Sequence, residues 1–82
     1  MNNALLKSKR VMYSITQKAL GEKLGLCEKT MNKKECSDIN LFTADEMLMI
    51  KDELHLSLEE FDSIFFDNKL TKNYNNNNIG NI

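Results

Sequence analysis

The sequence has no proline, only three glycines and no long apolar run. A membrane-spanning helix needs roughly 18 consecutive apolar residues, and the chain has no such stretch. It also lacks sustained alternation of apolar and polar residues and an Asn-Gly turn between apolar runs, so the pattern argues against β-strands. The first residues do not follow the basic, apolar and cleavage-site order of a signal peptide. We therefore expect an all-α, cytoplasmic protein without membrane contact.

Groups that could catalyse a reaction or bind a metal are equally scarce. Cys27 and Cys36 have no nearby histidine or third cysteine to complete a tetrahedral site. The one histidine, His55, lies far from both in the sequence, and there is no glycine-rich phosphate loop. We expect no metal, no cofactor and no enzymatic activity, and two reduced cysteines that behave as small apolar residues.

The net charge of −1 hides two halves of opposite charge. Residues 1–37 contain eight basic and three acidic side chains, a net charge of +5, whereas residues 38–82 contain three basic and nine acidic side chains, a net charge of −6. A positive face backed by an acidic one orients a protein on a polyanion. The acidic total therefore does not exclude DNA binding, although it argues against a strong binder that ignores sequence.

Eighty-two residues are enough for one small domain, near the size at which burial alone gives marginal stability. We expect five helices within residues 1–67. The first covers residues 3–13, Thr16 is the N-cap of the second, and the third covers residues 28–35 behind Cys27 at its cap position. Capping-box patterns at residues 43–46 and 57–60 start the fourth and fifth helices.

Apolar residues at helical spacing predict which side chains face the core. The expected inward residues are Leu5, Leu6, Met12 and Tyr13 in the first helix, Ala44, Met47, Ile50 and Leu54 in the fourth, and Leu58, Phe61 and Phe65 in the fifth. His55 falls where the fourth helix ends, at a position that suits a residue tolerant of left-handed geometry.

Residues 16–34 carry the most informative spacing in the chain. Leu20 and Leu24 share one helical face, Gly21 leaves room for a second helix, and Gly25 supplies the left-handed residue that ends the first. Leu26 and Met31 then anchor the next helix. This is the pattern of a helix-turn-helix, whose second helix enters the DNA major groove. The alternative is an ordinary helical hairpin with a solvated face.

The outward face of that second helix is polar and suits contacts with base edges and phosphates. Its residues are Glu28, Lys29, Thr30, Asn32 and Lys33. Lysine can donate to guanine, asparagine can pair with adenine, and the threonine methyl can touch thymine. Glu28 is either a reader of cytosine or a partner for neighbouring lysines.

Two features of the C-terminal region lie outside this pattern. Ile64, Phe66 and Leu70 fall off the expected inward stripe, so we expect an exposed apolar patch that a second copy covers in a homodimer. From Asn73 onward six of ten residues are asparagine, and residues 68–82 are expected to form a disordered tail.

With these motifs placed, residues 5–66 resemble the phage repressor and Cro group of the XRE family of regulators. The similarity is strongest over residues 6–11, at Thr16-Gln17, in the Leu-Gly pairs of residues 20–21 and 24–25, and over residues 54–58. It implies a five-helix, lambda-repressor-like domain that binds double-stranded DNA, and the expected homodimer implies a palindromic operator. By the same resemblance Gln17 would bond a phosphate and brace the recognition helix, and Arg10 would pair with Glu35.

Three departures from the family pattern affect these expectations. Lys34 stands where the family usually has an apolar core residue, so the third helix is expected to end early or rotate, with Cys36 or Ile39 filling the gap. Ser14 replaces a customary glycine. The segment 37–40 lacks the basic residues that often grip phosphate, and Asp38 would repel it.

Two functions remain open on the sequence. The first is a sequence-specific DNA-binding regulator of a phage or mobile element that represses by occupying an operator. The second is a protein-binding module on the same scaffold, such as an antirepressor or an inhibitor of a host defence protein, that uses the acidic half. Residues such as Glu59 and Asp62 would then contact the partner.

Overall fold

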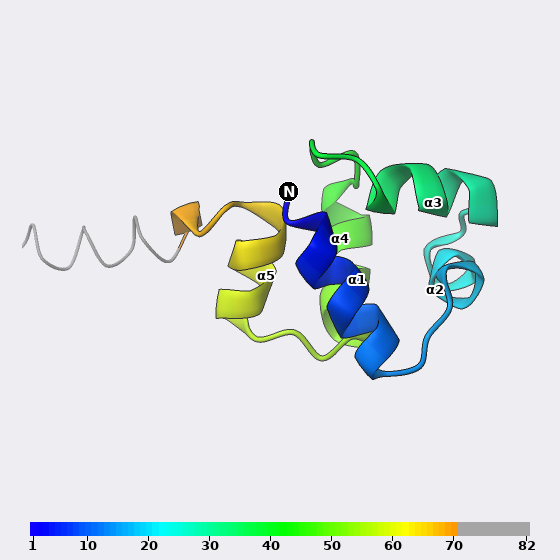
Figure 1. Ribbon diagram of the computed structural model, residues 1–82, viewed down its shortest axis with the longest axis horizontal. Helices are drawn as coiled ribbons and strands as arrows, with labels where there is room; N and C mark the ends of the chain where they lie inside the picture. Colours follow the sequence, from blue (N-terminus) through cyan, green and yellow to red (C-terminus); the bar gives the residue numbers. More distant parts are fainter. Residues whose placement is uncertain (71–82) are drawn as a thin grey trace, which may run out of the picture.

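The computed structural model describes residues 1–70, and within that range the chain forms five α-helices and no β-strand (Figure 1). The helices are α1 (Asn3–Met12), α2 (Gln17–Leu24), α3 (Glu28–Glu35), α4 (Ala44–Glu53) and α5 (Leu58–Phe65). The all-helical prediction is confirmed for these residues. None of these helices has the length and apolar character needed to cross a membrane. The predicted tail, residues 68–82, falls outside the described residues after its first three positions.

Side-chain caps fix where most of the helices begin. The Thr16 hydroxyl accepts the Ala19 backbone N–H at 3.0 Å, and complete capping boxes begin α4 at Thr43 and α5 at Ser57. A cap of this kind satisfies backbone donors that have no partner inside the helix. Cys27 makes no such bond to α3, as expected for a residue without a hydroxyl. The predicted helix starts are therefore confirmed.

All five helices meet in one core, and each contributes one fully buried apolar side chain. These residues are Leu6 of α1, Leu20 of α2, Met31 of α3, Ile50 of α4 and Ile64 of α5. Phe42, from the segment between α3 and α4, packs edge-on against Phe65 with ring centroids 6.0 Å apart. Helices of eight to ten residues are too short to be stable alone, so this shared core holds them in place.

Several residues expected to face inward do not. Met12 and Tyr13 are exposed at the end of α1. The buried residue in this part of the helix is Arg10. Ala44 and Leu58, the first residues of α4 and α5, are exposed as well. Periodicity gives the angle of a side chain around its helix, but it does not show how far along the helix the core extends.

The exposed apolar patch predicted for a dimer surface is wrong at Ile64. Ile64 has no exposed surface, because its side chain belongs to the hydrophobic core of the single chain. The Asn2 backbone N–H donates to the Ile64 carbonyl oxygen at 2.8 Å. Phe66 is half-buried, with its ring centroid 5.7 Å from that of Phe61. Of the three residues expected to form the patch, only Leu70 is exposed.

Candidate nucleic-acid interface

Helices α2 and α3 are joined by a tight turn and touch again at their middle. Gly25 ends α2 with a φ of 74°, in the left-handed region that favours glycine. Further back, a Cβ atom placed on Gly21 would lie 3.0 Å from the Leu26 carbonyl oxygen and 3.1 Å from the Met31 Cβ. The absence of a side chain at Gly21 therefore sets how closely the two helices approach. Both glycines have the roles that their spacing predicts.

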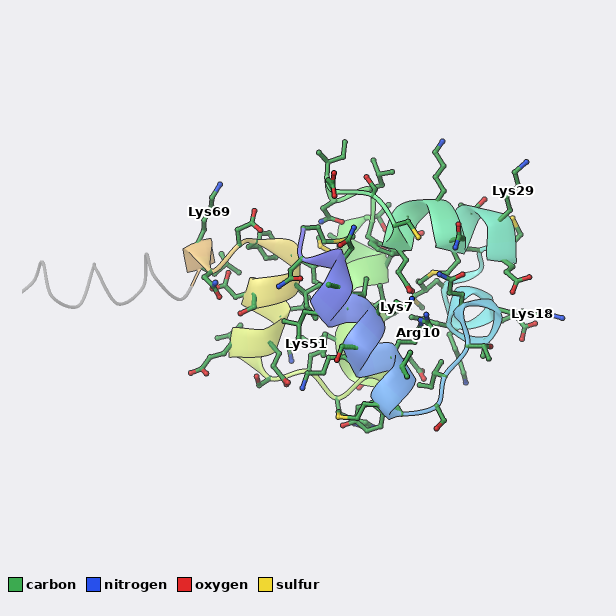
Figure 2. The ribbon with its side chains drawn as sticks, viewed as in Figure 1. Lys7, Arg10, Lys18, Lys29, Lys51 and Lys69 are labelled. Carbon is green, nitrogen blue, oxygen red and sulfur yellow. The ribbon has the colours of Figure 1, made fainter. Side chains whose placement is uncertain are left out.

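Helix α3 lies at the edge of the molecule and is attached by one side only (Figure 1). Met31 and Glu35 are its buried residues, and Thr30 and Lys34 are half-buried. The rest of its polar surface is open to solvent, at Glu28, Lys29, Asn32 and Lys33. The outward face predicted from the sequence is therefore exposed, except at Thr30. In Figure 2 Lys29 extends away from the body of the molecule, as Lys18 does from α2.

A buried ion pair fixes the inner side of α3. Arg10 of α1 is 8% exposed and Glu35 is 2% exposed. The Arg10 Nε donates to both carboxylate oxygens at 3.2 and 3.0 Å, and its Nη2 donates to Oε1 at 2.9 Å. A third donor of the guanidinium, Nη1, bonds the Ile15 carbonyl oxygen at 2.7 Å. The pair implied by the resemblance is present, and it joins α1, the segment before α2 and the end of α3.

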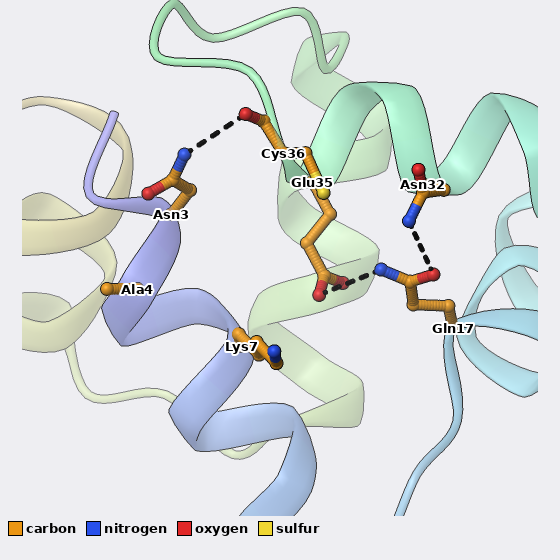
Figure 3. Close-up of a pocket in the computed structure, with 7 residues that line it drawn as sticks. All are labelled: Asn3, Ala4, Lys7, Gln17, Asn32, Glu35 and Cys36. Atoms are coloured by element: carbon orange, nitrogen blue, oxygen red, sulfur yellow. Dashed lines mark hydrogen bonds between the residues drawn. The ribbon is translucent and has the colours of Figure 1, made fainter.

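Gln17, the first residue of α2, lies between Glu35 and Asn32 of α3 (Figure 3). Its Nε2 donates to the Glu35 Oε1 at 3.3 Å, and its Oε1 accepts from the Asn32 Nδ2 at 2.9 Å. Gln17 thus contacts α3, which is the bracing part of its expected role. Its side-chain oxygen and one of its amide hydrogens are engaged within the protein.

These side chains line an open hollow of about 270 Å³ between α1, α2 and α3. Asn3, Ala4 and Lys7 of α1 form one wall, and Gln17, Asn32, Glu35 and Cys36 form the other (Figure 3). Asn3 closes one end by donating from Nδ2 to the Cys36 carbonyl oxygen at 3.2 Å. Every buried side-chain nitrogen or oxygen in the described part of the chain has a hydrogen-bond partner. The hollow therefore offers no unsatisfied buried polar group to a ligand.

Helix α3 continues through Lys34 to Glu35. The expectation that Lys34 would make this helix end early is therefore wrong. Its Nζ lies 2.7 Å from the Glu46 Oε1 of α4 and 5.9 Å from the centre of the Phe42 ring. Cys36 and Ile39 are both exposed and fill no gap. Burial raises the pKa of Glu46, but the hydrogen bonds from Lys34 and from the Thr43 backbone outweigh it and leave the pKa below its usual value.

The N-terminal end of α3 holds an exposed thiol. The Cys27 Sγ lies 3.2 Å from the Thr30 hydroxyl oxygen, and that hydrogen bond lowers the pKa of the Cys27 thiol. Both cysteines are free, as expected. No group of three or more histidine, cysteine, aspartate or glutamate residues within residues 1–70 could hold a metal ion.

Two residues that follow helices adopt left-handed backbone angles. Ser14 follows α1 with a φ of 58°, and His55 follows α4 with a φ of 50°. The Tyr13 and His55 rings contact each other with their centroids 5.3 Å apart, and the sequence did not indicate this contact. His55 therefore has the left-handed geometry expected of it.

Sequence reasoning missed three contacts near α3. These are the Gln17 bond to Asn32, the Lys34 pair with Glu46, and the packing of Lys34 over Phe42. Each joins residues on different helices or on a loop, and no local spacing signals such a pair.

The chain matches no family model, no curated protein and no solved structure.

Proposed function

We propose that this chain is a sequence-specific DNA-binding regulator of the lambda-repressor-like class, in which α3 is the recognition helix. The observation that carries the proposal is the attachment of α3, which is buried only through Met31 and Glu35 and presents a continuous polar face at the molecular edge. An α-helix fits the major groove, which is about 12 Å wide. Eight residues span about 12 Å, enough to reach several base pairs.

The charge distribution supports the same proposal. The basic half of the chain, residues 1–37, contains α1, α2 and α3, and the acidic half begins after α3. DNA would meet the basic surface, where lysines neutralise phosphates and release counterions. The resemblance to phage repressors adds the expectation that the protein represses by occupying an operator in a phage or mobile element.

A mobility-shift titration with duplex DNA from upstream of the protein's own gene tests this proposal. Lys29→Ala and Lys33→Ala should each weaken binding, by roughly 1–3 kcal/mol where the lysine contacts a base. A lysine that contacts only phosphate would weaken binding to specific and random DNA alike. Lys69→Ala is the matched control, because Lys69 is exposed at the opposite end of the molecule (Figure 2). Unchanged binding in the Lys29/Lys33 double variant would contradict the assignment of α3.

A protein-binding module is the second candidate, and the segment between α3 and α4 favours it. Residues 37–40 contain no basic side chain, and Asp38 is exposed there. A module of this kind would bind no DNA and would lose its partner when Glu59, which is exposed, is replaced by lysine. Asp62 does not belong to such a surface, because it is fully buried and its Oδ1 accepts the Leu70 backbone N–H at 2.9 Å.

A further inference from the structure

Helices α2 and α3 are held together at three separate points. The turn through Gly25 joins the end of α2 to the start of α3, and the close contact of Gly21 with Met31 lies near the middle of both helices. The third point is the open end, where Gln17 meets Asn32 and Glu35. Two short helices joined only at a turn and at one central contact can still change their angle. The bonds at Gln17 add a restraint on that angle.

The direction of each hydrogen bond at the open end is set by charge. The Glu35 carboxylate can only accept, so Gln17 must turn its amide nitrogen toward Glu35 and its oxygen toward Asn32. Asn32 must then donate, as its Nδ2 does at 2.9 Å. Arg10 anchors the series, because it holds the Glu35 carboxylate through three donor contacts. The buried ion pair thus determines the orientation of an exposed amide on α3.

Resting on the proposed function, we propose that Asn32 is a positioning residue for α3 and that base recognition lies with Lys29 and Lys33. Asn32 commits an amide hydrogen to Gln17, on the side of α3 that faces the hollow (Figure 3). A bidentate contact with adenine needs the oxygen and the second amide hydrogen of an asparagine to face the base together, whereas the Asn32 amide nitrogen is turned toward Gln17 at the hollow. Lys29 and Lys33 lie one turn apart on the exposed face, and neither forms an ion pair within residues 1–70.

The recognised DNA should therefore carry guanines in its major groove at the positions that face the two lysines. Lysine has donors and no acceptor, and guanine presents two acceptors, N7 and O6, on that edge. An asparagine that read adenine would add an A·T requirement beside them. The positioning role predicts that no such requirement depends on Asn32.

The hydrogen bonds can be tested without DNA by NMR on the full chain labelled with ¹⁵N. The Asn32 side-chain amide should exchange with water more slowly than the amide of the exposed Asn2. Gln17→Ala should abolish that protection, whereas the control variant Lys33→Ala should leave it unchanged. Equal exchange at Asn32 and Asn2 in the wild-type protein would overturn the proposal.

Selection from a pool of randomised DNA duplexes tests the recognition role. Lys29→Ala and Lys33→Ala should each erase a guanine preference, with a loss of roughly tenfold on the selected sequence. Asn32→Ala should weaken binding and keep every base preference, and the Gln17/Asn32 double alanine variant should bind no more weakly than the weaker single variant.

The outcomes distinguish a failure of the positioning role from a failure of the proposed function. If Asn32→Ala erases the preference at one base pair and its loss adds to that of Gln17→Ala, the positioning role is overturned while DNA binding stands. If the wild-type protein enriches no sequence, the proposed function fails and the guanine assignment fails with it. The exchange measurement still decides whether Gln17 and Asn32 fix α3.

Discussion

At the scale of single residues, the most consequential contact is the pair of Arg10 and Glu35. Both side chains are almost completely buried, and the guanidinium also bonds the Ile15 carbonyl oxygen and so ties three segments together. Removing two charges from water is costly, and attraction inside the protein offsets that cost only when the geometry is good. Four hydrogen bonds from one guanidinium meet that condition.

The first prediction concerns this pair. Arg10→Met should lower the free energy of unfolding by about 3 kcal/mol, because it leaves the Glu35 carboxylate buried without its counter-charge. Adding Glu35→Leu should recover part of that loss, since no uncompensated charge then remains. Urea titrations of the two single variants and the double variant measure the cycle. Purely additive losses would mean that the two side chains do not stabilise each other.

At the scale of elements, the junction of α2 and α3 depends on two glycines that serve different needs. At Gly25 the requirement is the backbone angle, because a Cβ there would meet nothing within 4 Å. At Gly21 the requirement is space, because a Cβ would press on the Leu26 carbonyl and on Met31. The first glycine allows the turn, and the second allows the two helices to pack.

The second prediction separates these roles by paired substitutions. Gly25→Ala should cost about 1 kcal/mol through left-handed strain and leave the packing of α3 unchanged. Gly21→Ala should cost about 1 kcal/mol as well, because overpacking exceeds the gain in helix propensity, and it should also displace α3. Thermal melts measure the stabilities, and NMR shifts of Met31 report the displacement. A more stable Gly21→Ala variant with unmoved Met31 signals would refute the role in spacing.

At the scale of the whole molecule, the core uses α5 differently from the expectation based on its sequence. Ile64 is 0% exposed and Leu58 is 60% exposed, the reverse of the predicted arrangement. Ile64 belongs to the core cluster and is buried within one chain, so its burial needs no second copy. A homodimer stays a prediction, because two half-sites would add affinity to a short recognition helix, but Ile64 cannot form its interface.

The third prediction compares these two positions. Ile64→Ala should lower the free energy of unfolding by about 2–5 kcal/mol without changing the oligomeric state, as expected for a core residue. Leu58→Ala should change it by no more than about 0.5 kcal/mol. Urea denaturation and light scattering at matched concentrations measure both effects. Conversion of a wild-type dimer to folded monomers by Ile64→Ala would restore Ile64 to the interface.

The sequence alone determined where the helices begin and where α2 ends, because the signals involved are local. A hydroxyl before a helix, a glutamate three residues later and a glycine in a left-handed turn act within one turn of the backbone, so Thr43, Ser57 and Gly25 could be assigned by inspection. The exposed polar face of α3 follows from the same short-range periodicity.

Only the tertiary structure decided which contacts join the helices. Lys34 reaches Glu46 on another helix, Asn32 reaches Gln17, and Ile64 is buried in the shared core. These outcomes depend on the angle and offset at which helices cross, and those are set by the packing of every core side chain together. The local spacing of residues does not predict that arrangement. The positions of Asn32 and Ile64 therefore became clear only in the folded chain.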